Sequence, residues 1–194
     1  EQALRDPRGD AACREGLENT LIEADELIRT FNALLRVARL EAGVLGDNLE
    51  TFDVSALVND LAEFYEPVAE EASARIDVET AGEIYLSADR QLISQALTNL
   101  VENALKYGLA EAAMGAARRI VIGAKILADG AELWVADNGE GIRPEDFDRV
   151  LKRFVRLDEA RSKPGTGLGL SLVAAVIRQH GGTIELADNR PGVK

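Results

Sequence analysis

The sequence predicts a two-layer α/β sandwich, a mixed β-sheet under three helices, preceded by one long N-terminal helix. Three segments, over 55–72, 89–107 and 168–180, repeat apolar residues at helical spacing. Short β-prone runs stand before and between them. A length of 194 residues with a hydrophobic fraction of 46% suits one ordinary soluble domain plus an extension.

Charge and cysteine content narrow the class of protein. The net charge of −12 argues against general nucleic-acid binding. The single cysteine, Cys13, cannot form a disulfide within the chain and fits a reducing compartment. It lies on a predicted helix, so we interpret it as structural. No apolar run approaches the ~18 residues that span a bilayer, and no signal peptide is visible. We therefore expect a cytoplasmic chain.

The N-terminal extension is predicted to be one helix over 10–42, with Asp10 as N-cap and Gly43 at its end. Its apolar residues alternate spacings of four and three, which is a heptad repeat. They are Leu17, Leu21, Ala24, Ile28, Phe31, Leu35 and Ala38. A helix this long cannot bury the whole repeat against a small domain, so we expect a partner helix. Residues 1–9 are interpreted as the end of a preceding helix and a turn.

After the extension we expect a short strand near Phe52, a helix over 55–72, and strands near 76–78 and 84–86. The helix over 89–107 comes next and has an apolar stripe typical of a core-facing surface. The stripe consists of Ile93, Ala96, Leu97, Leu100, Val101 and Ala104.

The other face of this helix carries Asn99, Asn103, Lys106 and Tyr107, at positions i, i+4, i+7 and i+8. An amide oxygen can ligate Mg²⁺, a lysine supplies a point charge for phosphate, and a tyrosine ring can pack beside a base. This face therefore fits a magnesium–nucleotide complex. Taken alone, it fits an ordinary solvated surface equally well.

Strands are predicted over 118–127 and 132–137, and the second runs into the sequence VADNGEGI. Asp137 stands at the strand end, where its carboxylate can accept a hydrogen bond from an exocyclic amine such as that of adenine. Gly139 and Gly141 let the backbone approach a flat ring. For this segment alone, a plain Asp-Asn-Gly hairpin turn is the simpler interpretation.

The stretch between Arg143 and Pro164 is net positive, with seven basic and five acidic residues in a chain of net charge −12. This local reversal of sign favours binding of a polyanion, although a mixed solvated loop is the alternative. The basic residues are Arg143, Arg149, Lys152, Arg153, Arg156, Arg161 and Lys163.

The segment GTGLGLSLV, residues 165–173, runs from a glycine-rich turn into the last predicted helix, over 168–180. Such a turn can hold phosphate on backbone N–H groups at a helix N-terminus. A lone Gly-x-Gly-x-Gly often marks only a flexible loop, and neither a Walker motif nor a dinucleotide fingerprint occurs. His180, the only histidine, lies at the end of this predicted helix. A strand over 183–187 is expected to follow.

The order and spacing of these segments resemble one superfamily, the GHKL (Bergerat-fold) ATP-binding domain. Sensor histidine kinases, Hsp90-type chaperones, type II topoisomerases and MutL-type repair proteins share this domain. Residues 51 to about 190 are most similar to the histidine kinases of two-component systems, because LKRFVRLDEAR (151–161) and IRQHGGTIEL (177–186) resemble that branch.

The resemblance implies that the chain binds ATP or ADP with Mg²⁺. It implies that Asn103 ligates the metal and that Asp137 reads the adenine amine above Gly139 and Gly141. The other implied nucleotide contacts are Asn99, Lys106, Tyr107, Ile142, Arg153, Phe154, Gly165, Thr166, Gly167, Leu168, Gly169 and Leu170. Leu151 and Val155 depart from the aromatic pattern of many relatives, which leaves packing of the lid, the loop over 143–164, open.

The function implied by the resemblance is the catalytic region of a sensor histidine kinase, which transfers the γ-phosphoryl group of MgATP to a histidine for relay to a response regulator receiver domain. Relatives that hydrolyse ATP usually place a glutamate at the position of Asn99, and an amide cannot act as a general base. Residues 1–45 would be the second helix of a dimerisation hairpin and 46–194 the ATP-binding domain.

The phosphoacceptor histidine should lie upstream on the first helix of that hairpin. The resemblance implies that His180 is structural instead, because relatives have a structural residue at this position near the helix C-terminus. We therefore expect this chain to bind ATP without phosphorylating itself, and the whole protein to be a homodimer that meets the membrane only through regions outside this chain. The chain also looks cut short at its end. Two alternatives belong to the same superfamily. A non-catalytic or serine-kinase-type nucleotide module is disfavoured by the heptad helix, and a chaperone- or topoisomerase-type ATPase is disfavoured by Asn99 and the short lid.

Overall fold

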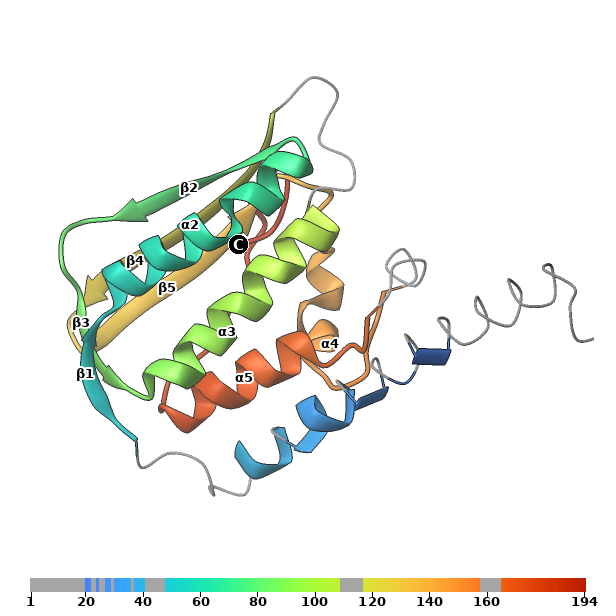
Figure 1. Cartoon of the computed structure of the whole chain (residues 1–194), viewed down its shortest axis with the longest axis horizontal. Coiled ribbons are helices and arrows are strands. Elements are labelled where there is room, and N and C mark those ends of the chain that lie inside the picture. The colour runs from blue at the N-terminus through green and yellow to red at the C-terminus, as the bar shows by residue number, and fades with distance from the viewer. Residues whose placement is uncertain are drawn as a thin grey trace, which may run out of the picture.

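The computed structural model describes residues 20–21, 24, 27–28, 30–35, 37–40, 48–108, 117–157 and 165–194. Helices α2 (Val54–Glu71) and α3 (Arg90–Asn103) lie on one face of a sheet, and α5 (Gly169–Gln179) packs along α3 (Figure 1). The predicted two-layer α/β sandwich with three helices over a sheet is thus confirmed. All three helices begin or end within about two residues of the predicted bounds, except at the C-terminal end of α3.

The strands form a mixed sheet and a separate two-stranded ribbon. In the sheet, β2 (Ala74–Thr80) is parallel to β4 (Arg118–Leu127), and β4 is antiparallel to β5 (Gly130–Asp137). The ribbon pairs β1 (Glu50–Asp53) with β3 (Tyr85–Ala88) in antiparallel fashion. The five strands predicted between residues 50 and 137 are therefore present.

Asp53 connects the ribbon to the first helix of the sandwich. It is the N-cap of α2, and its carboxylate accepts hydrogen bonds from the backbone N–H groups of Ser55 (2.9 Å) and Ile84 (3.1 Å). The Ile84 N–H contributes most to lowering the pKa of Asp53. This aspartate thus fixes both the start of α2 and its position beside the strand that precedes α3.

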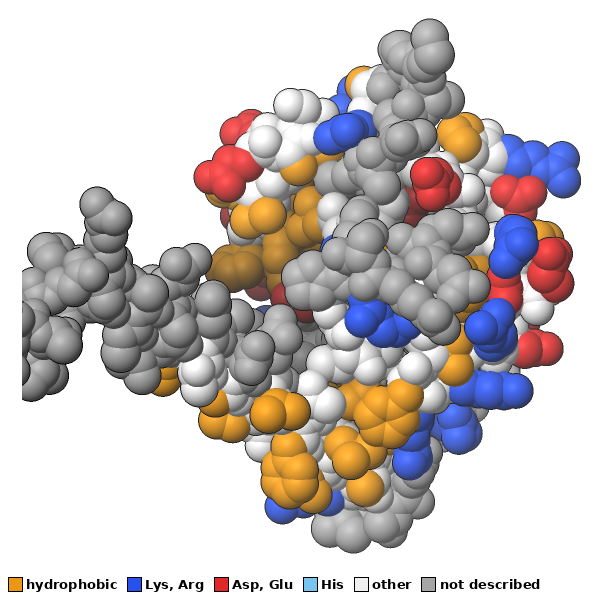
Figure 2. All heavy atoms as spheres, turned by 90° about the vertical axis from the view of Figure 1, so that its right-hand side faces the viewer, with side chains coloured by type: hydrophobic (Ala, Val, Ile, Leu, Met, Phe, Trp, Pro, Cys, Tyr) orange, Lys and Arg blue, Asp and Glu red, His pale blue; other side chains and the backbone are white. Residues whose placement is uncertain are grey.

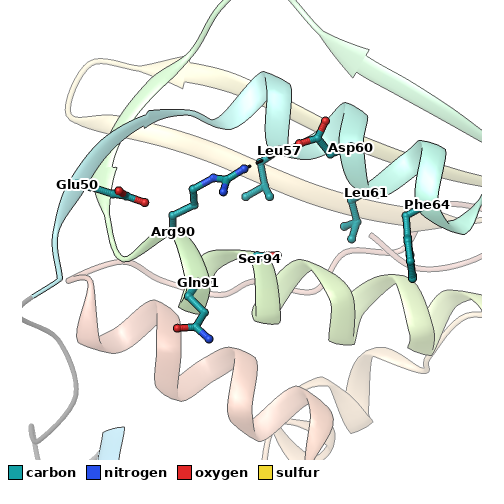
Figure 3. Close-up of a pocket in the computed structure, with 8 residues that line it drawn as sticks. All are labelled: Glu50, Leu57, Asp60, Leu61, Phe64, Arg90, Gln91 and Ser94. Carbon is teal, nitrogen blue, oxygen red and sulfur yellow. Dashed lines mark ion pairs between the residues drawn. The ribbon is translucent and has the colours of Figure 1, made fainter.

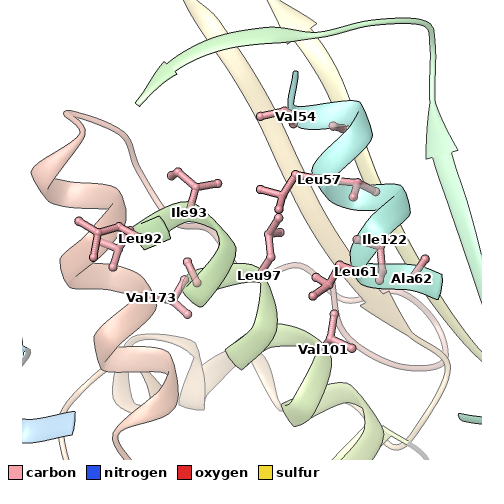
Figure 4. Packing of buried hydrophobic residues seen from close by; sticks show 14 of the residues in the cluster. Val54, Leu57, Leu61, Ala62, Leu92, Ile93, Leu97, Val101, Ile122 and Val173 are labelled. Atoms are coloured by element: carbon pink, nitrogen blue, oxygen red, sulfur yellow. The ribbon is translucent and has the colours of Figure 1, made fainter. Parts of the chain in front are cut away.

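One hydrophobic core lies between the helices and the sheet (Figure 4). Val54 and Val58 of α2, Val101 of α3, and Ile120 and Ile122 of β4 have no exposed surface. The predicted apolar stripe of α3 faces this core, because all of its members are buried except Leu100, which is half-buried against the same cluster. Burial of this stripe turns the opposite, polar face of α3 away from the core.

Two local predictions are wrong. The strand expected over 183–187 does not form: these residues have no strand assignment, and the backbone pairs with the last residues of the described chain only from Ala187 onward. Ala187 and Lys194 exchange backbone hydrogen bonds of 2.7 and 2.8 Å, which closes residues 187–194 into a C-terminal hairpin. The helix expected to continue to 107 ends as an α-helix at Asn103, and Ala104–Gly108 form a wider π-helical turn, η2.

The described residues between 20 and 40 are helical, as expected for the extension, whereas Asp10, Cys13 and Gly43 lie outside the described residues. Phe31 of the heptad repeat is exposed. Val37 and Leu40 are buried and belong to the same core cluster as the sandwich. Figure 2 shows exposed hydrophobic side chains gathered on the lower part of the face it draws. None of the helices in the described part of the chain combines the length and apolarity needed to cross a membrane.

Candidate nucleotide-binding site

The π-turn η2 places two of the predicted site residues at the C-terminal end of α3. Lys106 and Tyr107 both lie in this turn, and the Lys106 Nζ is 5.1 Å from the centroid of the Tyr107 ring. Single π-turns inside helices occur frequently at functional sites, because the wider turn changes the direction of the side chains that follow. The strict i+7 and i+8 spacing of the sequence prediction therefore does not hold beyond Asn103.

The glycine-rich segment nevertheless approaches the polar side chains at the C-terminal end of α3 and in η2. A Cβ on Gly165 would lie 2.7 Å from the Lys106 Nζ and 3.1 Å from the Tyr107 hydroxyl. A Cβ on Gly169 would lie 3.5 Å from both the Asn103 Nδ2 and the Asn99 Oδ1. The structure thus brings two polar side chains of α3 and two of η2 together with a glycine turn about sixty residues further on.

The first turn of α5 lies at this meeting point and offers backbone donors. Leu168 is the N-cap, and no side chain caps the helix. The Thr166 hydroxyl accepts the Leu168 N–H at 3.3 Å. The first N–H groups of a helix need partners, and the helix dipole favours an anion there. Because Gly169 adjoins Asn99 and Asn103, a phosphate bound at this helix end would meet both amides.

Asp137 is held at the end of β5 with 4% of its surface exposed. Its Oδ1 accepts the Gly139 N–H at 2.9 Å. Burial raises the pKa of Asp137, and the backbone N–H groups of Gly139 and Val193 oppose this shift. A Cβ on Gly108 would lie 2.8 Å from the Asp137 Oδ2, so the carboxylate rests directly against the residue that follows Tyr107. The candidate base-reading group therefore adjoins the end of the asparagine helix.

The Asp-Asn-Gly sequence does not form a hairpin turn. Asn138 instead caps the start of β4, because its Oδ1 accepts the Arg119 N–H and its Nδ2 donates to the Ala117 carbonyl, both at 2.8 Å. The next element is the 3₁₀ turn η3 (Pro144–Asp146) rather than a strand. The simpler hairpin interpretation of this segment is thus wrong.

Part of the positive charge in the lid is used within the lid itself. Asp146, whose side chain is 5% exposed, accepts hydrogen bonds from Arg143 (3.0 Å) and Arg149 (3.1 Å). These contacts hold η3 to the short helix α4 (Phe147–Val150). Arg143 and Arg149 therefore support the fold of the lid, which a count of charges could not reveal.

Phe154 is 57% exposed, and its N–H donates to the Gly167 carbonyl at 2.9 Å. The end of the described lid is thus joined to the glycine turn. Arg161 and Lys163 lie outside the described residues. Figure 2 shows Lys and Arg side chains gathered along one side of the face it draws.

Several other residues are also predicted to contact the nucleotide. Leu168 is 1% exposed and belongs to the interior. Ile142, Arg153 and Leu170 are half-buried, and their contacts with a nucleotide stay predictions. Gly141 adjoins Gly192 of the C-terminal hairpin.

Sequence reasoning missed three residues that adjoin Asp137: Gly108, Asn189 and Gly192. Gly108 directly follows Tyr107 of the asparagine-helix motif, so its position in the sequence could have indicated a role in the site. The two hairpin residues lie beside Asp137 only in the folded chain, and no local sequence pattern predicts that contact.

His180 has the structural position that was expected. Its Nε2 accepts the Asp89 N–H at 3.0 Å, so in the neutral ring the Nδ1 carries the proton and donates to the Val176 carbonyl at 2.8 Å. Asp89 is the N-cap of α3, and His180 is the C-cap of α5. The imidazole therefore joins the ends of two helices.

A separate hollow of about 440 Å³ lies between α2 and the N-terminal half of α3 (Figure 3). It is lined by Glu50, Leu57, Asp60, Leu61, Phe64, Arg90, Gln91 and Ser94, and Arg90 and Asp60 form an ion pair of 3.9 Å across it. None of these residues belongs to the predicted nucleotide site, so the hollow is distinct from it.

The fold is a helical layer on a mixed sheet. At one end of it meet a polar helix face, a glycine turn and a buried aspartate at a strand end. This arrangement is that of an ATP-binding domain of the α/β sandwich class. Residues 88–194 match the family described as histidine kinase-, DNA gyrase B-, and HSP90-like ATPase. The chain belongs to this family, and it carries the ATP-binding catalytic domain of the sensor histidine kinase type.

Individual relatives agree with this assignment. The chain is 36% identical to the sensor protein IrlS of Burkholderia pseudomallei, over 99% of this chain and 40% of the relative. It is 34% identical to the sensor-like histidine kinase SenX3 of Mycobacterium tuberculosis, over 92% and 42%. The crystal structure of full-length ShkA in complex with AMPPNP superposes with a TM-score of 0.78 at 26% identity, covering 93% of this chain and 36% of that one. The chain thus spans about two fifths of the length of these sensor proteins.

Proposed function

We propose that the chain binds MgATP between α3, the first turn of α5 and the Asp137 loop. In the whole protein, this domain would transfer the γ-phosphoryl group to a histidine of a dimerisation helix. The observation that supports this most directly is the convergence of three glycines on the predicted side chains. Gly169 lies beside the two asparagines, Gly165 beside Lys106 and Tyr107, and Gly108 beside Asp137.

The residues present fit a magnesium nucleotide. In the described part of the chain, no group of three His, Cys, Asp or Glu side chains could hold a metal ion. A site that receives Mg²⁺ together with the triphosphate needs only one or two protein oxygens, because phosphates and waters complete the shell. Asn103 supplies such an oxygen beside the first turn of α5. When bound, the ion neutralises charge on the phosphates and orients them.

The remaining roles follow from position. Lys106 and the N–H groups of the first turn of α5 would bind phosphate oxygens, and Asp137 would accept the adenine amine. Asn99 would favour transfer over hydrolysis. Its Nδ2 donates to the Gln95 carbonyl at 2.8 Å, and its Oδ1 points toward Gly169. Because an amide is not basic, neither atom can abstract a proton from water, as a carboxylate at this position could.

The domain division proposed for the chain is a helical region over 1–45 and the ATP-binding domain over 46–194. The exposed part of the heptad repeat would pair with a second helix in a homodimer, because a contiguous apolar surface of this kind needs cover. A response regulator receiver domain would then take the phosphoryl group from the histidine. In the whole protein, this region would lie in the cytoplasm.

Calorimetry with ATP in the presence and absence of Mg²⁺ tests the binding site. We expect Asn103→Ala to weaken the magnesium-dependent affinity by about tenfold or more, since it removes a metal ligand. Asn59→Ala is the matched control, because the Asn59 amide donates to the Ser55 carbonyl on the exposed side of α2. Equal affinities for wild type and Asn103→Ala would reject the proposed metal role.

A second experiment separates the candidate activities. We mix the chain with ATP and a separate polypeptide that carries a dimerisation helix with its histidine. Acid-labile phosphate on that polypeptide supports the kinase proposal. Acid-stable phosphate on serine would indicate the serine-kinase alternative, and steady-state release of phosphate without any partner would indicate a hydrolysing relative.

A further inference from the structure

The C-terminal hairpin, residues 187–194, holds the backbone of Asp137 at two points. The Asn189 Nδ2 donates to the Asp137 carbonyl at 2.7 Å. The Asp137 N–H donates to the Val193 carbonyl at 3.0 Å. On its other side, Asp137 pairs with Ile120 of β4. The hairpin therefore occupies the edge of β5 at the residue whose carboxylate the site uses.

The hairpin is itself well defined. The Asn189 N–H donates to the Gly192 carbonyl at 3.1 Å, and the pairing of Ala187 with Lys194 closes its base. Gly192 has φ = +106°, and a Cβ there would overlap the Asp137 carbonyl group. The turn can thus lie against Asp137 only with glycine at this position, which brings the Asn189 amide within hydrogen-bonding distance.

We infer that the C-terminal hairpin positions the Asp137 carboxylate, with Asn189 as the positioning residue, and thereby sets the preference of the site for a 6-aminopurine. This inference rests on the role proposed above for Asp137. Fixing both the N–H and the carbonyl of one residue fixes the direction of its Cα–Cβ bond. The Gly139 N–H, which donates to the Asp137 Oδ1 at 2.9 Å, then holds the carboxylate in the direction that this backbone allows. A hydrogen bond to a purine amine is sensitive to that direction.

A side chain that only stabilised the fold would affect all nucleotides alike. A side chain that aims Asp137 would affect only nucleotides whose base offers the amine. The relevant quantity is therefore the ratio of two dissociation constants, for ATP and for purine riboside triphosphate, which has hydrogen in place of the 6-amino group.

The test compares Asn189→Asp and Asn189→Ala with wild type. Asn189→Asp keeps the shape of the side chain but places a carboxylate oxygen against the Asp137 carbonyl, and Asn189→Ala removes the donor. Arg190→Ala is the matched control in the same turn, since the Arg190 side chain is 87% exposed and bonds Asp188. Thermal unfolding of each variant records whether the fold is retained.

We expect wild type and Arg190→Ala to prefer ATP over purine riboside triphosphate by about tenfold or more. The two Asn189 variants should lose most of that preference, while their affinity for purine riboside triphosphate changes less than about twofold. A preference that survives in both Asn189 variants, or a parallel loss of both affinities, would overturn the positioning role. Equal affinities in wild type would instead overturn the proposed role of Asp137 itself.

Discussion

Replacing Gly139 by alanine tests whether the contact between the Asp137 loop and the asparagine helix sets the geometry of the site. A Cβ on Gly139 would lie 2.6 Å from the carbonyl carbon of Gly108 and 2.7 Å from its Cα. Ordinary contacts between carbon atoms are about 3.5–4.0 Å, so the loop would have to move by about 1 Å. The atoms in the way belong to backbone, which cannot swing aside as a flexible side chain can.

Such a shift separates Asp137 from Lys106 and Tyr107, because Gly108 directly follows them in η2. Overpacking of this kind costs about 1–3 kcal/mol of unfolding free energy. Loss of a hydrogen bond to a charged group such as the Asp137 carboxylate costs about 1.5–3 kcal/mol, which is about ten- to a hundredfold in affinity. We therefore expect Gly139→Ala to remain folded and to bind ATP between about ten- and a hundredfold more weakly than wild type.

Urea denaturation and calorimetry with MgATP measure the two effects on the same samples. Gly181→Ala is the control, because Gly181 has φ = +71° and a Cβ added there would meet no atom within 4 Å. Its left-handed backbone should cost alanine about 1–2 kcal/mol without affecting ATP. If folded Gly139→Ala bound ATP as tightly as Gly181→Ala, the close approach of the loop to Gly108 would not determine the site.

Three further predictions concern stability. Burial and Glu102 raise the pKa of Tyr65 to about 12, so folding stability should decline as pH rises above 10; alkaline unfolding of Tyr65→Phe should lack this part of the decline. Asp146→Ala should lower the unfolding free energy by about 1–3 kcal/mol, because it removes the shared partner of two arginines, and thermal unfolding measures this loss. The Ile84 N–H lowers the pKa of Asp53, so Asp53→Ala should lower the unfolding free energy near neutral pH. Wild type should lose this stability as pH falls through the pKa of Asp53, and the variant should not. Unfolding free energies measured across acid pH would contradict this if the curves of the two proteins stayed parallel.

The sequence predicted what local signals encode. The helix expected over 55–72 spans Val54–Glu71, because Asp53 caps its start and its apolar residues repeat at helical spacing. The strand expected over 183–187 failed for the opposite reason. Its alternating residues fit a strand, but a strand needs a second backbone beside it, and a backbone partner is found only from Ala187 onward, in the hairpin.

In the candidate site, too, local features could be predicted from the sequence and long-range contacts could not. Asn99, Asn103 and the glycine turn could be recognised because each has a local pattern with a chemical reason. The contacts that join these parts could not, since the π-turn leaves no periodicity to detect and the Asn189–Asp137 hydrogen bond spans 52 positions. The count of basic residues in the lid overstated the positive charge available for a polyanion, because two of the arginines form ion pairs with Asp146 in the folded segment.

Because Asp137 is buried, we infer that its carboxylate serves to recognise the base and does not stabilise the fold. Burial raises its pKa above the ordinary 3.8, so the group binds protons more tightly in the folded than in the unfolded chain, and stability falls as pH rises through the folded pKa. An ionised Asp137 is thus a cost to the fold at neutral pH, which the N–H groups of Gly139 and Val193 offset only in part. The amine of a bound base would donate a further hydrogen bond to the Asp137 carboxylate and so stabilise its ionised form. We therefore expect Asp137→Asn to unfold at neutral pH with a free energy equal to or above that of wild type while losing ATP affinity, measured by urea denaturation and calorimetry. A variant that lost stability and binding together would show that the carboxylate is structural.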